Sequence, residues 1–195
     1  KLCLLSTLVL TVLACSTVSA QDFSNKGKDF WVGYGYHQVM TAGNQQEMVL
    51  YFAADQTSNV TVTIPALGYM QAYVVAAGTV VTSAVIPKAN PQDARLQTEG
   101  THDKGIHIVS DKPIVAYAHI YNQSVSGATI LYPTNTLGKE YYSVNYTNTS
   151  NTAAANCWFY VIAADTGNTT VEITPSGNTV GGWLAGNTYS VNLTQ

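Results

Sequence analysis

The feature that most constrains the fold of this chain is an internal repeat with a spacing close to 110 residues. Residues 27–31 read GKDFW, and the similar run GKEYY returns at 138–142. Three more matches follow in the same order at offsets of 110, 109 and 108: 53–55 with 163–165, 59–64 with 168–173, and 77–78 with 185–186. A unit of this length has the size of a β-sandwich domain and is too long for one rung of a solenoid.

Between these landmarks the residues follow a strand-and-turn pattern. Short runs rich in Val, Ile, Tyr and Thr alternate with Gly, Pro, Asn and Asp, and apolar residues do not recur at helical spacing over a long window. The run 110–113 (SDKP) is interpreted as a hairpin turn. The predicted strands lie near residues 29–36, 46–54, 59–65, 71–76, 79–87, 106–110, 113–122, 128–133, 141–146, 157–164, 169–174 and 188–194.

The repeat and the strands together predict an all-β fold of tandem antiparallel β-sandwich repeats, the second copy truncated. We expect a signal peptide over 1–20, an N-terminal linker over 21–26, a first sandwich over 27–137 and an incomplete second one over 138–195. Both faces of the strand predicted at 157–164 are apolar, so this strand is expected to be covered on both sides.

The N-terminus has the pattern of an export signal. The run 2–14 is almost purely apolar, and its 13 residues are too few to cross a bilayer. Small residues ending at Ala20 predict cleavage there, which would leave Gln21 as the first residue of the mature chain. An alternative is a loose lipobox at 12–15, in which Cys15 would be lipidated. We expect no transmembrane segment in the mature chain.

Composition excludes one class of partner. Lys and Arg total 8 against 11 Asp and Glu, and Arg95 is the single arginine, so no basic cluster is present to bind nucleic acid. After the predicted cleavage only Cys157 remains, and one thiol cannot form an internal disulfide. Abundant Thr, Asn and Tyr with only 10% charged residues are typical of a secreted or cell-surface module.

Motifs of catalysis and of phosphate binding are missing from the sequence. Three sets of polar residues are candidates for chemistry: Glu99 and Asp103 as a carboxylate pair, His102, His107 and His119 as metal ligands, and Asp55 and Asp165 as calcium ligands. Each set has a simpler structural explanation, as loop acids, strand histidines and turn-capping aspartates respectively. We therefore expect a protein that is not an enzyme and has no catalytic residue, cofactor or metal.

The most suggestive candidate for binding is the aromatic strand near 29–36. Alternation places Trp31, Gly33 and Gly35 on one face, where an indole beside two glycines offers a flat platform for a ligand such as a sugar ring. The competing interpretation is structural: Trp31 covers the bare backbone of the glycines, or Trp31 packs against the second copy.

Four segments together resemble a known family, the IgGFc-binding-protein N-terminal domain family. They are residues 27–33, 59–65, 105–114 and 137–141. The resemblance extends over 24–195 and implies an extracellular or cell-surface role without an established catalytic site, as in large exported proteins of Bacteroidota. None of these motifs carries a known Fc-contacting residue, so immunoglobulin binding is not implied for this chain.

Two hypotheses for the function follow. The first is a non-catalytic adhesion or scaffolding module of a larger exported bacterial protein. The alternative is a carbohydrate-binding module that accompanies a catalytic domain outside this sequence. The expected partner is an unknown extracellular protein or a glycan, and the expected location is secreted or cell surface.

Overall fold

The computed structural model describes residues 24–36, 45–145 and 156–195. The predicted signal peptide, its cleavage site at Ala20 and Gln21, and Cys15 lie outside the described residues. The strands are β1 (Gly27–Val32), β2 (Glu47–Ala54), β3 (Ser58–Ile64), β4 (Tyr69–Val75), β5 (Thr79–Thr82), β6 (Ile106–Tyr121), β7 (Ser126–Leu131), β8 (Asn168–Ile173) and β9 (Tyr189–Thr194). Two short 3-10 helices, Pro65–Leu67 and Thr134–Thr136, complete the described elements. The all-β prediction is confirmed.

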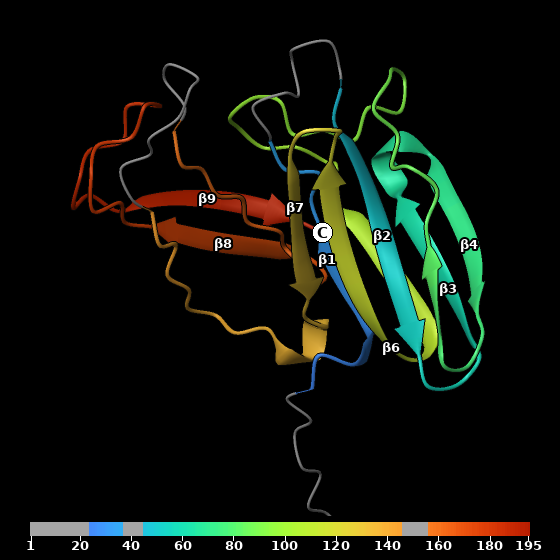
Figure 1. The fold of residues 1–195 in the computed structure, drawn as a ribbon. Coiled ribbons are helices and arrows are strands. Elements are labelled where there is room, and N and C mark those ends of the chain that lie inside the picture. The colour runs from blue at the N-terminus through green and yellow to red at the C-terminus, as the bar shows by residue number, and fades with distance from the viewer. Residues whose placement is uncertain (1–23, 37–44, 146–155) are drawn as a thin grey trace, which may run out of the picture.

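The long strand β6 organises the main sheet, which has seven strands (Figure 1). Its first half pairs antiparallel with β1 and β3, and β3 pairs with β4. Its second half pairs with β2 and β7, and β2 pairs with β5. The sheet is therefore two halves that share β6 and fold toward each other in a sandwich-like, nearly closed arrangement.

The expected hairpin turn at 110–113 is wrong, because β6 runs through it as one strand. Gly27 lies opposite Ile114 and Asp29 opposite Val109, so β6 advances five residues while β1 advances two. The irregularity bends β6 where it passes from one half of the sheet to the other. Pro113 is tolerated at this bend because the ladder is already interrupted there.

The bend also holds the connection between β2 and β3. Asp111 accepts hydrogen bonds from the Asn59 backbone N–H and side-chain amide, both at 2.8 Å. These bonds hold the pKa of the Asp111 carboxyl below its usual range, the backbone bond contributing most. Lys112 Nζ donates to the Thr57 carbonyl at 2.7 Å. Asp111 and Lys112, which in the sequence indicate a turn of their own, thus cap the turn between β2 and β3.

The core lies between the two half-sheets and follows from period-2 alternation. Phe30, Val32 and Tyr34 alternate along the chain and are buried, whereas Tyr36 is exposed. The inward residues of β2, β3 and β6 are likewise buried: Met48, Leu50, Phe52, Ala54, Val60, Val62, Ile64, Ile106, Ile108, Ile114, Ala116 and Ala118. This contiguous cluster is the hydrophobic core.

Several predicted strands differ from the observed ones. Residues 141–145 and 157–164 are extended chain without a ladder, although their composition favours strands. A strand satisfies its backbone groups through a ladder, and neither run forms a ladder with another described segment. β5 ends at Thr82, but Ser83 and Ile86 still donate backbone hydrogen bonds to Leu50 and Met48.

One turn of the sequence repeat has the same geometry in both copies. Gly78 and Gly186 have φ of +70° and +77°. In each case the backbone N–H of the residue after the glycine donates a hydrogen bond three residues back: Thr79 to the Ala76 carbonyl, and Asn187 to the Leu184 carbonyl. This is the geometry of a turn that requires positive φ at its third residue. The pairing differs, however: β8 pairs with β9, whereas β3 pairs with β4 and β6. Tandem sandwiches remain a prediction.

Candidate functional site

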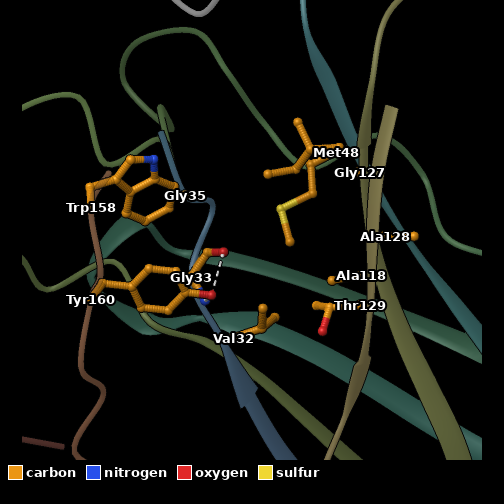
Figure 2. A pocket seen from close by; sticks show the side chains of 11 residues that line it. Val32, Gly33, Gly35, Met48, Ala118, Gly127, Ala128, Thr129, Trp158 and Tyr160 are labelled. Carbon is orange, nitrogen blue, oxygen red and sulfur yellow. Dashed lines mark hydrogen bonds between the residues drawn. The ribbon is translucent and has the colours of Figure 1, made fainter. Parts of the chain in front are cut away.

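The candidate site is an apolar pocket at a seam of the main sheet. β1 and β7 both pair with β6 but not with each other, and the pocket opens between them (Figure 2). Its volume is about 210 Å³. The lining comprises inner-face side chains of the sheet, the start of β7 and two aromatic rings: Val32, Gly33, Gly35, Met48, Ala118, Ile120, Gly127, Ala128, Thr129, Trp158 and Tyr160.

The aromatic wall of the pocket packs on the two glycines that follow β1. A β-carbon on Gly33 would lie 3.1 Å from Tyr160 Cε2, and one on Gly35 would lie 2.2 Å from Trp158 Cη2. The two rings stack on each other with centroids 5.6 Å apart. Gly33 and Gly35 therefore provide the bare backbone that lets residues 158 and 160 approach this closely (Figure 2).

A polar contact orients the Tyr160 ring. Its hydroxyl lies 3.4 Å from both the backbone N and the carbonyl O of Gly33. Burial raises the pKa of the Tyr160 hydroxyl, so it stays neutral at physiological pH. All eleven lining residues are uncharged at neutral pH. The pocket can therefore hold an apolar group, and its lining offers no general base or charged nucleophile.

Trp31 lies elsewhere. Its indole stacks on the His107 imidazole, with centroids 4.1 Å apart and planes 7° from parallel. His107 Nε2 lies 2.8 Å from Asp29 Oδ2, which fixes the imidazole in place. A β-carbon on Gly105 would meet Trp31 Cζ3 at 3.0 Å. Trp31 thus covers Gly105, and the side chains nearest the other two glycines come from residues 96, 158 and 160. A ligand platform at Trp31, Gly33 and Gly35 remains a prediction.

The candidate polar residues are dispersed. His102 Nε2 contacts the Thr98 carbonyl at 2.9 Å, and His107 and His119 lie on opposite halves of β6. Asp55 forms an ion pair with Lys26. Within the described ranges, no three His, Cys, Asp or Glu side chains gather where they could hold a metal ion.

A second cluster of polar and aromatic side chains lies around His119 on β6. His119 Nδ1 lies 3.2 Å from the Tyr51 hydroxyl, and His119 Nε2 lies 2.7 Å from Ser126 Oγ. The Tyr121 hydroxyl donates to Glu47 Oε2 at 3.2 Å, and its ring contacts the imidazole. This cluster, called the His119 patch below, combines aromatic faces with hydroxyl and carboxylate groups. The sequence does not reveal it, because its members come from three strands.

The sequence also does not identify the residues that form the pocket. Gly33 and Gly35 indicate that a large side chain packs on them, but the sequence does not say which. Trp158 and Tyr160 lie 123 and 127 positions away from them, in a run predicted to be a strand. The side chains that lie nearest these two glycines are Leu96, Trp158 and Tyr160.

Comparison with known proteins gives one match. Residues 127–195 match the family model described as IgGFc binding protein. The chain matches none of the curated proteins and none of the solved structures with which it was compared. The described residues include no helix with the length and apolar character required to cross a bilayer. The matched region contains β7, Trp158 and Tyr160 and so contributes one wall of the pocket. The match over residues 127–195 supports the resemblance to the IgGFc binding protein family that the motifs predicted.

Proposed function

We propose that this chain is a non-catalytic binding module for adhesion or scaffolding outside the cell, within a larger exported protein. The observation that carries this function is the concentration of exposed apolar side chains in the family-matched region. They are Tyr132, Leu137, Tyr141, Tyr142, Val144, Trp158, Phe159, Tyr160, Val161, Val180 and Leu184. Residues 158–161 are four consecutive members of this set, and exposed apolar side chains that adjoin one another are typical of surfaces that contact another macromolecule.

The same region supports the proposal that 138–195 repeats part of the first unit. Residues 157–164 align with 47–54 of the first copy, which include the central strand β2. Here Trp158, Phe159 and Val161 are 45%, 45% and 46% exposed, although their equivalents in β2 lie within a sheet. These three side chains are exposed and therefore available to a partner.

Binding can be tested on the mature chain. We would immobilise residues 21–195 and measure retention of purified secreted and surface proteins, with a glycan panel in parallel. Phe159→Ser should reduce retention, because it removes an exposed ring in the matched region. The matched control is Val109→Ser, which changes a residue on β6 that is 41% exposed and lies outside that region. Equal loss in both variants, or no retention, would contradict the proposal.

Export has its own test. Mass spectrometry of the protein recovered from its native cells should show Gln21, or its cyclised form, at the N-terminus. A lipid on Cys15 would instead establish a membrane anchor. An intact leader in material recovered from the cell interior would contradict export altogether.

The alternative, a carbohydrate-binding module, is favoured by the His119 patch. Its rings can stack on sugar faces, and its hydroxyl and carboxylate groups can bind sugar hydroxyls. Tyr51→Ala and Tyr121→Ala should then abolish binding on a glycan panel. Tyr132→Ala, which alters an exposed tyrosine beyond β7, should leave it unchanged. Binding of glycans that survives both patch variants would exclude this surface.

A further inference from the structure

We propose that the pocket binds an uncharged aromatic side chain, presented by an extended segment of a partner protein that adds as a strand to the outer edge of β7. The inference rests on the proposed binding function and names the site that would perform it. The volume of the pocket, the chemistry of its lining and the pairing of β7 each support this inference.

The volume suits one aromatic ring. The pocket encloses about 210 Å³. For comparison, an engineered apolar cavity of about 150 Å³ in another protein binds benzene. A phenylalanine side chain therefore enters without displacing the core beneath Met48 and Ala118, whereas a disaccharide exceeds the space.

The chemistry of the lining also selects the ligand. The lining carries no charge, so a charged side chain would lose its hydration without gaining a partner. The two side-chain hydroxyls in the wall are already engaged, since the Tyr160 hydroxyl contacts Gly33 and Thr129 Oγ1 donates to the Ile130 carbonyl. Sugar hydroxyls would face the same penalty. The complementary group is uncharged and apolar, and the stacked rings of Trp158 and Tyr160 favour an aromatic one.

The pairing of β7 shows how a partner could bring an aromatic side chain to the pocket. Within the described residues β7 pairs with β6 alone, so its other edge carries backbone groups without a ladder partner. Gly127, Ala128 and Thr129 belong to this strand and also line the pocket. A β-carbon on Gly127 would meet nothing within 4 Å, so a backbone can approach closely here. A strand added to this edge places alternate side chains at the pocket mouth.

Methionine methyl NMR of the mature chain provides a direct readout. The chain has three methionines: Met48 in the pocket lining, Met70 on β4, and Met40 outside the described residues. Met70 is 67% exposed on a strand that contributes nothing to the pocket, and serves as the internal control. The probes are toluene, a blocked pentapeptide of threonines with a central phenylalanine, and the same peptide with a central serine.

We expect toluene and the phenylalanine peptide to shift the Met48 methyl signal upfield in a saturable manner, and the Met70 signal to stay in place. The serine peptide should bind about tenfold more weakly or worse, because it buries no ring. Absence of a saturable Met48 shift with either ring probe would overturn the pocket as an aromatic site. Toluene binding without tighter binding of the phenylalanine peptide would overturn the strand as its source. A Met48 shift caused by cellopentaose would overturn the choice of ligand class.

Three variants, of which Gly138→Ala is the control, separate the pocket from general stability. Gly35→Ala should displace Trp158 and abolish the toluene shift, and Gly138→Ala, whose new methyl meets nothing within 4 Å, should leave it intact. Thr129→Phe, opposite Ala118 in the β6–β7 register, should fill the pocket with its own ring. Met48 should then be shifted upfield without a probe and respond no further. If none of the three variants behaves as expected, while Phe159→Ser still reduces the retention of partner proteins, this site is rejected and the proposed binding function stands.

Discussion

Gly35 and Trp158 are in contact across 123 positions of sequence, and the contact requires glycine. A β-carbon at position 35 would lie 2.2 Å from Trp158 Cη2, far inside van der Waals contact. Gly35 is thus a site of close approach, and the indole that it accepts closes one side of the pocket.

This contact leads to a stability prediction. Gly35→Ala forces the indole or the backbone to move and should lower the free energy of unfolding by about 1–3 kcal/mol, the usual effect of overpacking. Gly138→Ala adds a methyl in open space and should change it by less than about 0.5 kcal/mol. Urea denaturation of both variants measures the difference. Equal values would show that Trp158 does not occupy this position in solution.

Trp31→Ala should destabilise the protein, because the indole stacks on His107 and covers Gly105. The ring is only partly buried, so we expect a loss of about 2 kcal/mol, below the 3–5 typical of a fully buried tryptophan. Chemical denaturation measures the loss, and a glycan panel gives the second readout. If Trp31 serves as a ligand platform instead, the variant will lose glycan binding while its stability hardly changes.

The pair of Arg95 and Asp93 predicts a pH dependence. Two hydrogen bonds of 2.8 and 2.6 Å join the guanidinium to the carboxylate, and both side chains are about nine-tenths buried. The hydrogen bond from Arg95 is the main cause that holds the pKa of Asp93 below its usual 3.8. A carboxyl with a lower pKa in the folded state adds stability above about pH 4 and loses it as the pH falls through the folded-state value.

Asp93→Asn should therefore cost about 3 kcal/mol at pH 7, because the buried Arg95 charge loses its partner. The difference from the parent chain should shrink steadily as the pH falls below 4. Asp55→Asn is the control: its partner Lys26 is exposed, and its loss should cost less than about 1 kcal/mol. A constant difference between parent and Asp93→Asn from pH 7 down to pH 2 would refute this role of the pair.

The turn geometry that Gly78 and Gly186 share predicts an equal loss of stability when either glycine is replaced. Gly78→Ala and Gly186→Ala both place a β-carbon at positive φ in open space, so each should cost about 1 kcal/mol through backbone strain alone. Asparagine, which tolerates this conformation better, should cost less at both sites. Thermal denaturation measures both series. A cost at Gly78 without one at Gly186 would argue against equivalent turns in the two copies.

The prediction of individual strands succeeded where the information is local. Alternation of apolar and polar residues identifies β2, β3 and β8 within one residue at each end and gives the inward face of β1. Proline and glycine mark the turns after β3 and β4, because their backbone limits act within a few residues. The sequence alone also indicates the repeat, the all-β class and the family resemblance.

Only the tertiary structure decides how the segments meet. Ser110, Asp111, Lys112 and Pro113 have the composition of a turn, but β1, β2, β3 and β7 all pair along β6, and their ladders keep it one bent strand. Residues 157–164 have strand composition, yet they join no ladder in the described part of the chain, and Trp158 and Tyr160 lie against two distant glycines. Turn chemistry and alternation are properties of neighbours in sequence. The pairing along β6 instead depends on partners as far away as Gly27 opposite Ile114, and the pocket depends on a contact across 127 positions, from Gly33 to Tyr160. The sequence therefore determined the elements and their inner faces, and the long-range pairing decided the bend in β6 and the pocket.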